Sequence, residues 1–169
     1  MIRAKIRRCD SFLGDIMFEL KAPKIEVEAS LVGRTSLFLG GGISHCPPWQ
    51  NLMVDLLKDT ELVLFNPRRD DFDTSDASMT EQQIQWEHKY LKLATARMFW
   101  FPNETLCPIT LFELGKYLLS GDPLFVGCDP KYQRKIDLEI QISLELSNHE
   151  MSYSLKDISE KIILWYENY

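Results

Sequence analysis

The sequence predicts an α/β fold in which a parallel sheet of about five strands is flanked by helices. Short apolar segments alternate along the chain with longer amphipathic segments, which is typical of βαβ units. Several apolar segments end in glycine, Asn-Pro or proline turns. Strands of a parallel sheet are apolar throughout, because helices cover both of its faces. The predicted strands are Ser36–Leu39, Glu61–Phe65, Ala96–Phe101 and Leu124–Gly127, with a short further strand near 151–153.

Amphipathic helices are expected between and after these strands. Residues 132–148 alternate apolar and polar side chains, as a strand does, but a parallel sheet needs a crossover there. We therefore predict a helix for this segment. Pro47 and Pro48 suit the first turn of the first helix, and Ser154 can cap the last. The expected helices span roughly 46–59, 79–95, 110–120, 132–148 and 154–167.

Length and charge indicate one domain that is neither membrane-bound nor a binder of duplex nucleic acid. A chain of 169 residues with 45% hydrophobic side chains suits a single domain over 1–169. We expect the first 30 residues to form an arm or an edge strand, since Lys24–Ala29 alternates weakly. The net charge of −6 opposes binding to DNA or RNA duplexes. No apolar stretch is long enough to cross a bilayer and no secretory signal is evident, so we expect a cytoplasmic protein.

The cysteines and histidines predict no metal site and no cofactor. No two of the four cysteines form a C-x-x-C pair, and we interpret them as reduced thiols. The three histidines are far apart in the sequence and lack the spacing of metal ligands. These residues are Cys9, Cys46, Cys107, Cys128, His45, His88 and His149.

The loops after the strands form the expected binding edge, because ligands of parallel sheets bind beyond the carboxyl ends of the strands. Gly40–Gly42 allows a ligand to approach the backbone closely, although a tight turn without a ligand is about as common. The segment lacks the lysine of a phosphate-binding loop and the G-x-G-x-x-G pattern. Asn66–Asp73 carries two arginines and three aspartates, which either contact a ligand or form a solvated loop.

Two glutamates are candidates for chemistry. Glu87 falls within the apolar arc of its helix, so it either faces a cavity or forms a salt bridge, for example with Arg97. Thr110-x-x-Glu113 fits a capping box at a helix start. Alternatively, a carboxylate in the first turn is held ionised by the helix dipole. It would then project from the sheet edge as the nucleophile of a double-displacement glycosyl transfer. Sequence physics leaves both interpretations of Glu113 open.

Six motifs, in order over roughly 35–137, resemble the nucleoside 2-deoxyribosyltransferase-like family. The resemblance implies a flavodoxin-like, doubly wound sheet and a homo-oligomer with composite active sites. It also implies cleavage of a nucleoside N-glycosidic bond by a glutamate nucleophile, which falls on Glu113. The motifs are Phe38-Leu39-Gly40-Gly41-Gly42-Ile43, Trp49-Gln50, Asn66-Pro67-Arg68-Arg69, Gln83-Ile84-Gln85-Trp86-Glu87, Phe99-Trp100-Phe101-Pro102 and Ile109-Thr110-Leu111-Phe112-Glu113-Leu114-Gly115.

The resemblance also suggests a wider set of site residues and one departure. The family often has an acid where this chain has Thr95, so the proton donor would be Asp71, Asp73 or water. Glu87 matches the family's Trp-Glu pair. The expected catalytic residues are Glu113, Glu87 and Asp71. The expected substrate-binding residues are Gly41, Gly42, Ile43, Trp49, Asn66, Arg68, Asp73, Trp100, Pro108 and Tyr117.

The leading hypothesis is thus an enzyme that transfers the (deoxy)ribosyl group of a nucleoside or nucleotide to another base or to water. Two alternatives stay open. One is a nucleotide-binding or nucleotide-sensing protein on the same fold, without turnover. The other is a structural partner protein whose alternating segment 136–146 forms an interface.

Overall fold

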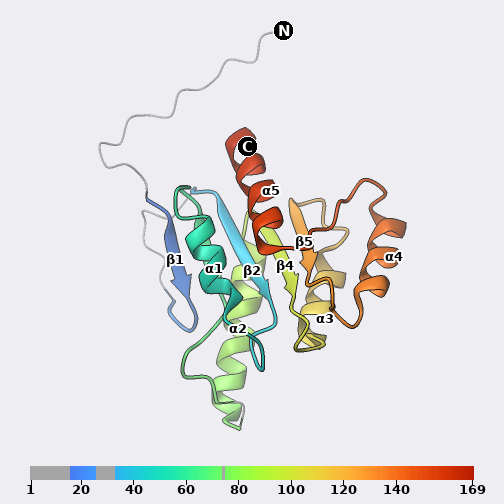
Figure 1. The fold of residues 1–169 in the computed structure, drawn as a ribbon. Helices are drawn as coiled ribbons and strands as arrows, with labels where there is room; N and C mark the ends of the chain where they lie inside the picture. Colours follow the sequence, from blue (N-terminus) through green and yellow to red (C-terminus); the bar gives the residue numbers. More distant parts are fainter. Residues whose placement is uncertain (1–15, 26–32, 74) are drawn as a thin grey trace.

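The computed structural model describes residues 16–25, 33–73 and 75–169 of the chain. These form a five-stranded, all-parallel sheet with the strand order β1-β3-β2-β4-β5, flanked by helices (Figure 1). The predicted α/β fold with a parallel sheet is therefore confirmed. The strands are β1 (Phe18–Lys21), β2 (Ser36–Gly41), β3 (Val63–Asn66), β4 (Ala96–Phe101) and β5 (Leu124–Cys128).

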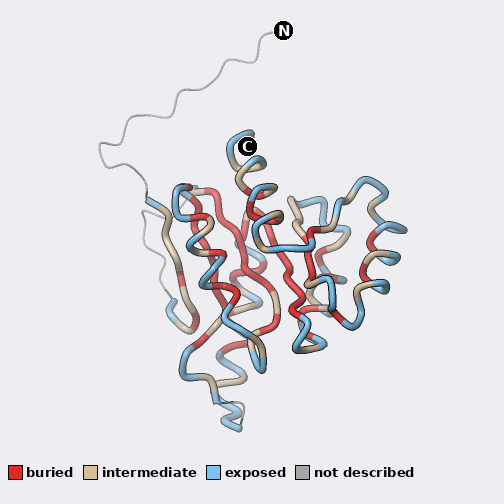
Figure 2. The backbone as a smooth tube through the Cα atoms, in the orientation of Figure 1, coloured by how far each residue is buried: buried red, intermediate tan, exposed pale blue. Residues whose placement is uncertain are grey.

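Helices cover both faces of the sheet. One apolar core lies under α1 and α5, and a second lies under α2, α3 and α4. Residues of β4 alternate between them: Met98 and Trp100 join the first core, and Phe99 and Phe101 the second. The central strands are accordingly buried along most of their length (Figure 2). The helices are α1 (Trp49–Leu56), α2 (Ala77–Leu93), α3 (Pro108–Tyr117), α4 (Lys135–Glu145) and α5 (Leu155–Asn168).

Most predicted elements are present, with shifted ends. The segment that alternates like a strand is the helix α4, and Ser154 caps α5 by accepting a hydrogen bond from the Asp157 amide at 3.1 Å. The short strand expected near 151–153 is reduced to an isolated parallel bridge between Gly127 and Ser152 beside β5.

The N-terminal region supplies an edge strand, but not from the alternating segment. Phe18–Lys21 pairs in parallel with β3, whereas Lys24 and Ile25 are outside any strand and residues 26–29 lie outside the described part of the chain. In the described ranges, no helix combines the length and apolar character that a membrane span requires.

The order of the strands fixes where a ligand can bind. From β2 the chain crosses to β3 on one side, and β4 then lies on the other side of β2. Such a reversal opens a crevice beyond the carboxyl ends of the strands at which it occurs, here β2 and β4. In Figure 1 this is the lower edge of the sheet, along which the loops after β2 and β4 lie.

Candidate functional site

A cavity of about 450 Å³ opens at the carboxyl edge of the sheet. This volume falls within the range of small-molecule binding sites, about 300–1,000 Å³. Five segments enclose it: the end of β2 with the loop after it, the loop after β3, one face of α2, the loop after β4, and the start of α3. The lining residues are Gly41–Ser44, Pro67, Arg69, Phe72, Thr80, Gln83, Ile84, Glu87, Thr105, Cys107–Thr110 and Glu113.

The loop after β2 is held in place from behind by α1. The Trp49 indole N–H donates to the Gly42 carbonyl oxygen at 2.9 Å, and a Cβ on Gly41 would overlap the Trp49 ring. A Cβ on Gly42 would lie 2.9 Å from the Cys107 Sγ atom. Both glycines are therefore required by close packing. Gly41, Gly42 and Ile43 line the cavity as expected, whereas Trp49 is buried behind them.

Glu87 faces the cavity from α2. It is half-buried, and its Oε1 atom accepts a hydrogen bond from the Gln83 side chain at 2.8 Å. Burial raises the pKa of the Glu87 carboxyl, and the bond from Gln83 opposes that rise. The proposed salt bridge with Arg97 is absent, because the Arg97 guanidinium donates to Asp122 at 2.7 Å instead. Of the two interpretations of Glu87, the cavity-facing one holds.

Glu113 faces the same cavity, but the capping box predicted around it is wrong. Helix α3 begins at Pro108, which suits the first helical position because it needs no N–H there. The residue before it, Cys107, has left-handed backbone angles (φ 49°, ψ 53°), and no side chain caps the helix. Thr110 is thus inside the helix, and Glu113 is in the second turn, beyond the amide groups that a capping residue would bind.

The prediction that the helix dipole keeps Glu113 ionised is also wrong. Burial, together with the nearby charge of Glu87, raises the pKa of the Glu113 carboxyl from 4.5 to about 8, although Lys116 lowers it. The dipole acts mainly within the first turn, and Glu113 lies beyond it. Glu113 is therefore mostly protonated at neutral pH.

The two arginines after β3 have different roles. The Arg68 Nε atom donates to Gln50 at 2.7 Å, and its guanidinium also reaches the Cys46 and Pro47 carbonyl oxygens, so Arg68 joins two loops outside the cavity. Arg69, which the expected site omitted, is buried and lines the cavity. Its guanidinium donates to Asp71 at 3.2 Å and to Gln82 at 2.9 Å.

The remaining expected site residues lie elsewhere, except Pro108, which lines the cavity. Asp71 and Asp73 are exposed, and Asp73 accepts hydrogen bonds from Ser75. Asn66 is buried and donates to the Glu19 carboxylate at 2.6 Å. Trp100 and Tyr117 are buried in the two cores, away from the cavity lining.

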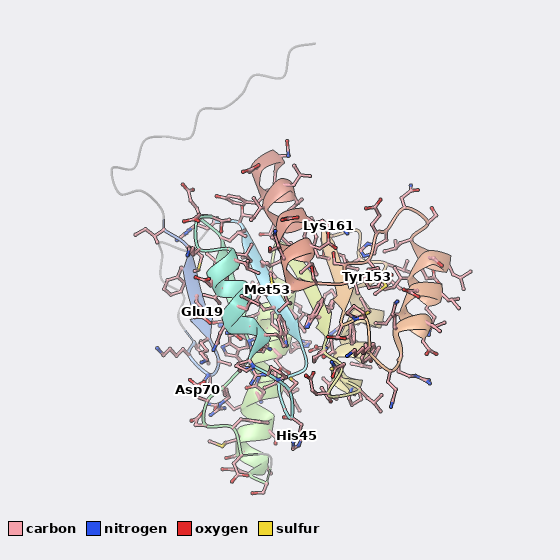
Figure 3. All side chains as sticks on the ribbon, in the orientation of Figure 1. Glu19, His45, Met53, Asp70, Tyr153 and Lys161 are labelled. Atoms are coloured by element: carbon pink, nitrogen blue, oxygen red, sulfur yellow. The ribbon has the colours of Figure 1, made fainter. Side chains whose placement is uncertain are left out.

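Two further features of the edge bear on the sequence hypotheses. His45 and Asp70 mark the exposed loops after β2 and β3 in Figure 3, and neither residue lines the cavity. Thr95 lies at the opposite edge, where its Oγ1 atom accepts a hydrogen bond at 3.0 Å from the amide of Ser36, the first residue of β2. The departure from the family at Thr95 therefore leaves the cavity unchanged. No cluster of metal-binding side chains occurs in the part of the chain that the structure describes.

Comparison with known proteins identifies a family. Residues 34–132, more than half of the chain, match the sequence model described as "Nucleoside 2-deoxyribosyltransferase like". None of the curated proteins compared matches the chain. Among solved structures, a conserved protein from Enterococcus faecalis V583 is similar, with 14% identity and a TM-score of 0.52 over 78% of this chain and 99% of that one. At this identity, the likeness shows the fold alone.

Proposed function

The chain belongs to the nucleoside 2-deoxyribosyltransferase-like family, and on that premise we propose that it cleaves the N-glycosidic bond of a nucleoside or nucleotide, with Glu113 as nucleophile. Family membership supports glycosyl transfer as the kind of chemistry. The observation that carries the finer proposal is the pair of carboxyl groups, Glu113 and Glu87, which face one cavity of suitable size from two different helices.

The proposed reaction has two steps. In the first, the ionised Glu113 attacks the anomeric carbon C1′, the C1′–N bond breaks, and its electron pair leaves with the base. The departing base takes a proton from Glu87. In the second step, another base or a water molecule attacks C1′ and releases Glu113, while the incoming group returns its proton to Glu87. Transfer to a base makes the protein a transferase, and transfer to water makes it a hydrolase.

Glu87 is the best-supported proton donor. Asp71 and Asp73, the donors considered from the sequence, are exposed and outside the cavity lining. Burial raises the pKa of Glu87, which is the direction that a general acid requires. Two carboxyl groups in one largely apolar site cannot both ionise readily, so the pair is suited to hold and pass one proton.

We also propose that a second copy of the chain covers the mouth of the cavity. Ile84 and Ile109 line the cavity and are 59% and 65% exposed, and Phe112, next to Glu113, is 72% exposed. Apolar side chains gathered at a site entrance are typical of an interface. Light scattering during size-exclusion chromatography tests this: a dimer or larger assembly that Phe112→Asp dissociates is expected. A monomeric wild-type protein would contradict the proposal.

The function is tested with purified full-length protein and a panel of deoxynucleosides, their 5′-monophosphates and NAD, each with and without an acceptor base. Chromatography should detect free base from at least one substrate, and a new nucleoside if transfer occurs. Glu113→Gln should abolish product, while Glu81→Gln, an exposed carboxyl on α2, should retain activity. Absence of free base from every substrate, or full activity of Glu113→Gln, would overturn the proposal.

One observation favours a second candidate function, binding without turnover. The raised pKa of Glu113 keeps it mostly protonated at neutral pH, and a protonated carboxyl is a poor nucleophile. A binding protein would be stabilised against heat by one member of the same panel and would release no base from it at any pH between 6 and 9.

A further inference from the structure

We propose that Gln83 is a positioning residue, which fixes the Glu87 carboxyl group so that its Oε2 atom faces the substrate. The proposal rests on the proposed function, because it concerns the residue assigned there as proton donor. Gln83 precedes Glu87 by one turn of α2, so both side chains lie on the same face of the helix. Both line the cavity.

The contacts of Gln83 tie Glu87 to the sheet. The Gln83 side chain is 6% exposed, and its Nε2 atom donates to the Pro67 carbonyl oxygen at 2.7 Å and to the Glu87 Oε1 atom at 2.8 Å. Pro67 directly follows β3. The orientation of Glu87 is therefore set by the backbone at the carboxyl edge of the sheet as well as by its own helix.

The orientation of the Gln83 amide is determined by its partners. Both partners are oxygen atoms. The Pro67 carbonyl oxygen can only accept a hydrogen bond, and the same holds for an ionised Glu87 carboxylate. A reversed amide would therefore place the Gln83 Oε1 atom against two acceptors. The Oε1 atom itself is buried and has no hydrogen-bond partner. Buried acceptors without a donor are uncommon and often accompany functional sites. The amide thus keeps its bond to Glu87 although its own carbonyl is left unsatisfied.

The hydrogen bond from Gln83 gives the two carboxyl oxygens of Glu87 different roles. With Oε1 occupied by Gln83, the proton that passes to the base is carried by Oε2. The other titratable groups around the cavity are Glu113 on α3, Arg69 after β3 and the Cys107 thiol. The Arg69 guanidinium is bound to Asp71 and Gln82, and burial raises the pKa of Cys107 to about 11. Gln83 is the group whose hydrogen bond directly favours the ionised form of Glu87.

The first test measures the Glu87 titration by NMR of ¹³C-labelled glutamate carboxyls in the full-length protein, with Glu87→Gln to assign the signal. Gln83→Met removes the donor but keeps the shape of the side chain. It should raise the titration midpoint by about one to two pH units, since hydrogen bonds to charged groups are the stronger ones. Gln85→Met is the matched control, because Gln85 donates to Glu81 at 2.9 Å across the same four-residue spacing, in the opposite direction along the helix, on the exposed side of α2.

The second test separates proton donation from general packing. A 7-methylated purine deoxynucleoside carries a positive base that leaves without being protonated, whereas the unmethylated nucleoside needs a proton. Gln83→Met should reduce kcat/KM at least about tenfold on the unmethylated substrate and much less on the methylated one. Gln83→Asn, which keeps an amide but is shorter, is the second variant should Gln83→Met fold poorly.

The outcomes of these tests distinguish a failure of the positioning role of Gln83 from a failure of the proposed glycosidic-bond cleavage. An unchanged Glu87 midpoint in both Gln83 variants, or an equal loss of activity on both substrates, would overturn the positioning role. Failure of the wild-type protein to release base from either substrate would count against the proposed function, while the NMR titration would still decide whether Gln83 controls Glu87.

Discussion

Replacing Glu113 by glutamine should stabilise the folded protein, and the gain should grow with pH. The Glu113 carboxyl has a pKa of about 8 in the folded protein and about 4.5 when solvated. Between these values the unfolded chain has lost the proton that the folded protein still holds. Folding then takes up a proton, so the folded state loses stability as the pH rises. Glutamine carries no charge and escapes this loss.

The magnitude follows from the difference between the two pKa values. A separation of about 3.5 pH units corresponds to about 5 kcal/mol at most, at roughly 1.4 kcal/mol per unit. Because the side chain is only partly buried, water that enters the cavity reduces this, and we expect roughly 2–4 kcal/mol at pH 9. The gain should be close to zero near pH 4.5, where the carboxyl is largely protonated in both states.

Urea unfolding of the wild-type protein and of Glu113→Gln at pH 5, 7 and 9 measures the difference in their free energies of unfolding. Glu81→Gln, an exposed site on α2, controls for the loss of one negative charge. The reasoning is refuted if the difference in unfolding free energy between Glu113→Gln and wild type is the same at all three pH values, or if the variant becomes less stable relative to wild type as the pH rises.

Three further outcomes are expected. The kcat/KM of the wild-type enzyme should fall as the pH rises above about 8, because the pair of carboxyls then loses the one proton that the departing base needs, whereas the residual activity of Glu87→Gln should rise with pH as Glu113 ionises, with a midpoint below about 8 because the charge of Glu87 is gone; pH–rate profiles would report both. Gly42→Ala should lower kcat/KM at least about tenfold, because its Cβ would crowd the wall of the cavity, whereas a Cβ at Gly115 meets nothing within 4 Å and Gly115→Ala should retain activity. Trp49→Phe should cost about 1 kcal/mol of stability in denaturant unfolding, since the Gly42 carbonyl loses its 2.9 Å hydrogen bond but keeps the one from Gln50 at 3.3 Å.

The parallel sheet could be predicted from the sequence because the apolar pattern of each strand agrees with the alternation of strands and helices along the whole chain. Ala96–Phe101 is apolar except for Arg97 and ends at a proline, and the strand has the predicted limits. In α4, Leu138 and Ile142 are buried while Ile136, Ile140 and Leu144 are exposed. These exposed residues produced the misleading alternation. The helix is predicted correctly because a parallel sheet needs a crossover there, which is an argument from chain topology rather than from the spacing of apolar residues.

The site was harder to predict because it depends on side-chain direction. Arg68 and Arg69 are adjacent and chemically identical, yet Arg69 lines the cavity and Arg68 joins loops outside it. No composition or spacing separates them. Gln83 was available from the helical pattern, because it falls with Glu87 inside the apolar arc of α2. An amide in an apolar arc is a weaker signal of a functional site than a carboxylate, because burying a neutral polar group costs less than burying a charge.

The start of α3 at Pro108 explains why the capping box and the dipole-stabilised charge predicted for Glu113 were wrong, and it also bears on the proposed proton transfer. In the first turn, the helix dipole would favour the ionised form of the glutamate, and its partner Glu87 would then face a negative charge. In the second turn and partly buried, Glu113 has a pKa raised to about 8, and ionisation of one carboxyl of the pair favours protonation of the other. The proposed mechanism needs that coupling twice: Glu87 must hold the proton while Glu113 attacks, and must regain it when the acceptor arrives. A site that had stabilised both charges would be more stable and would have no proton to give.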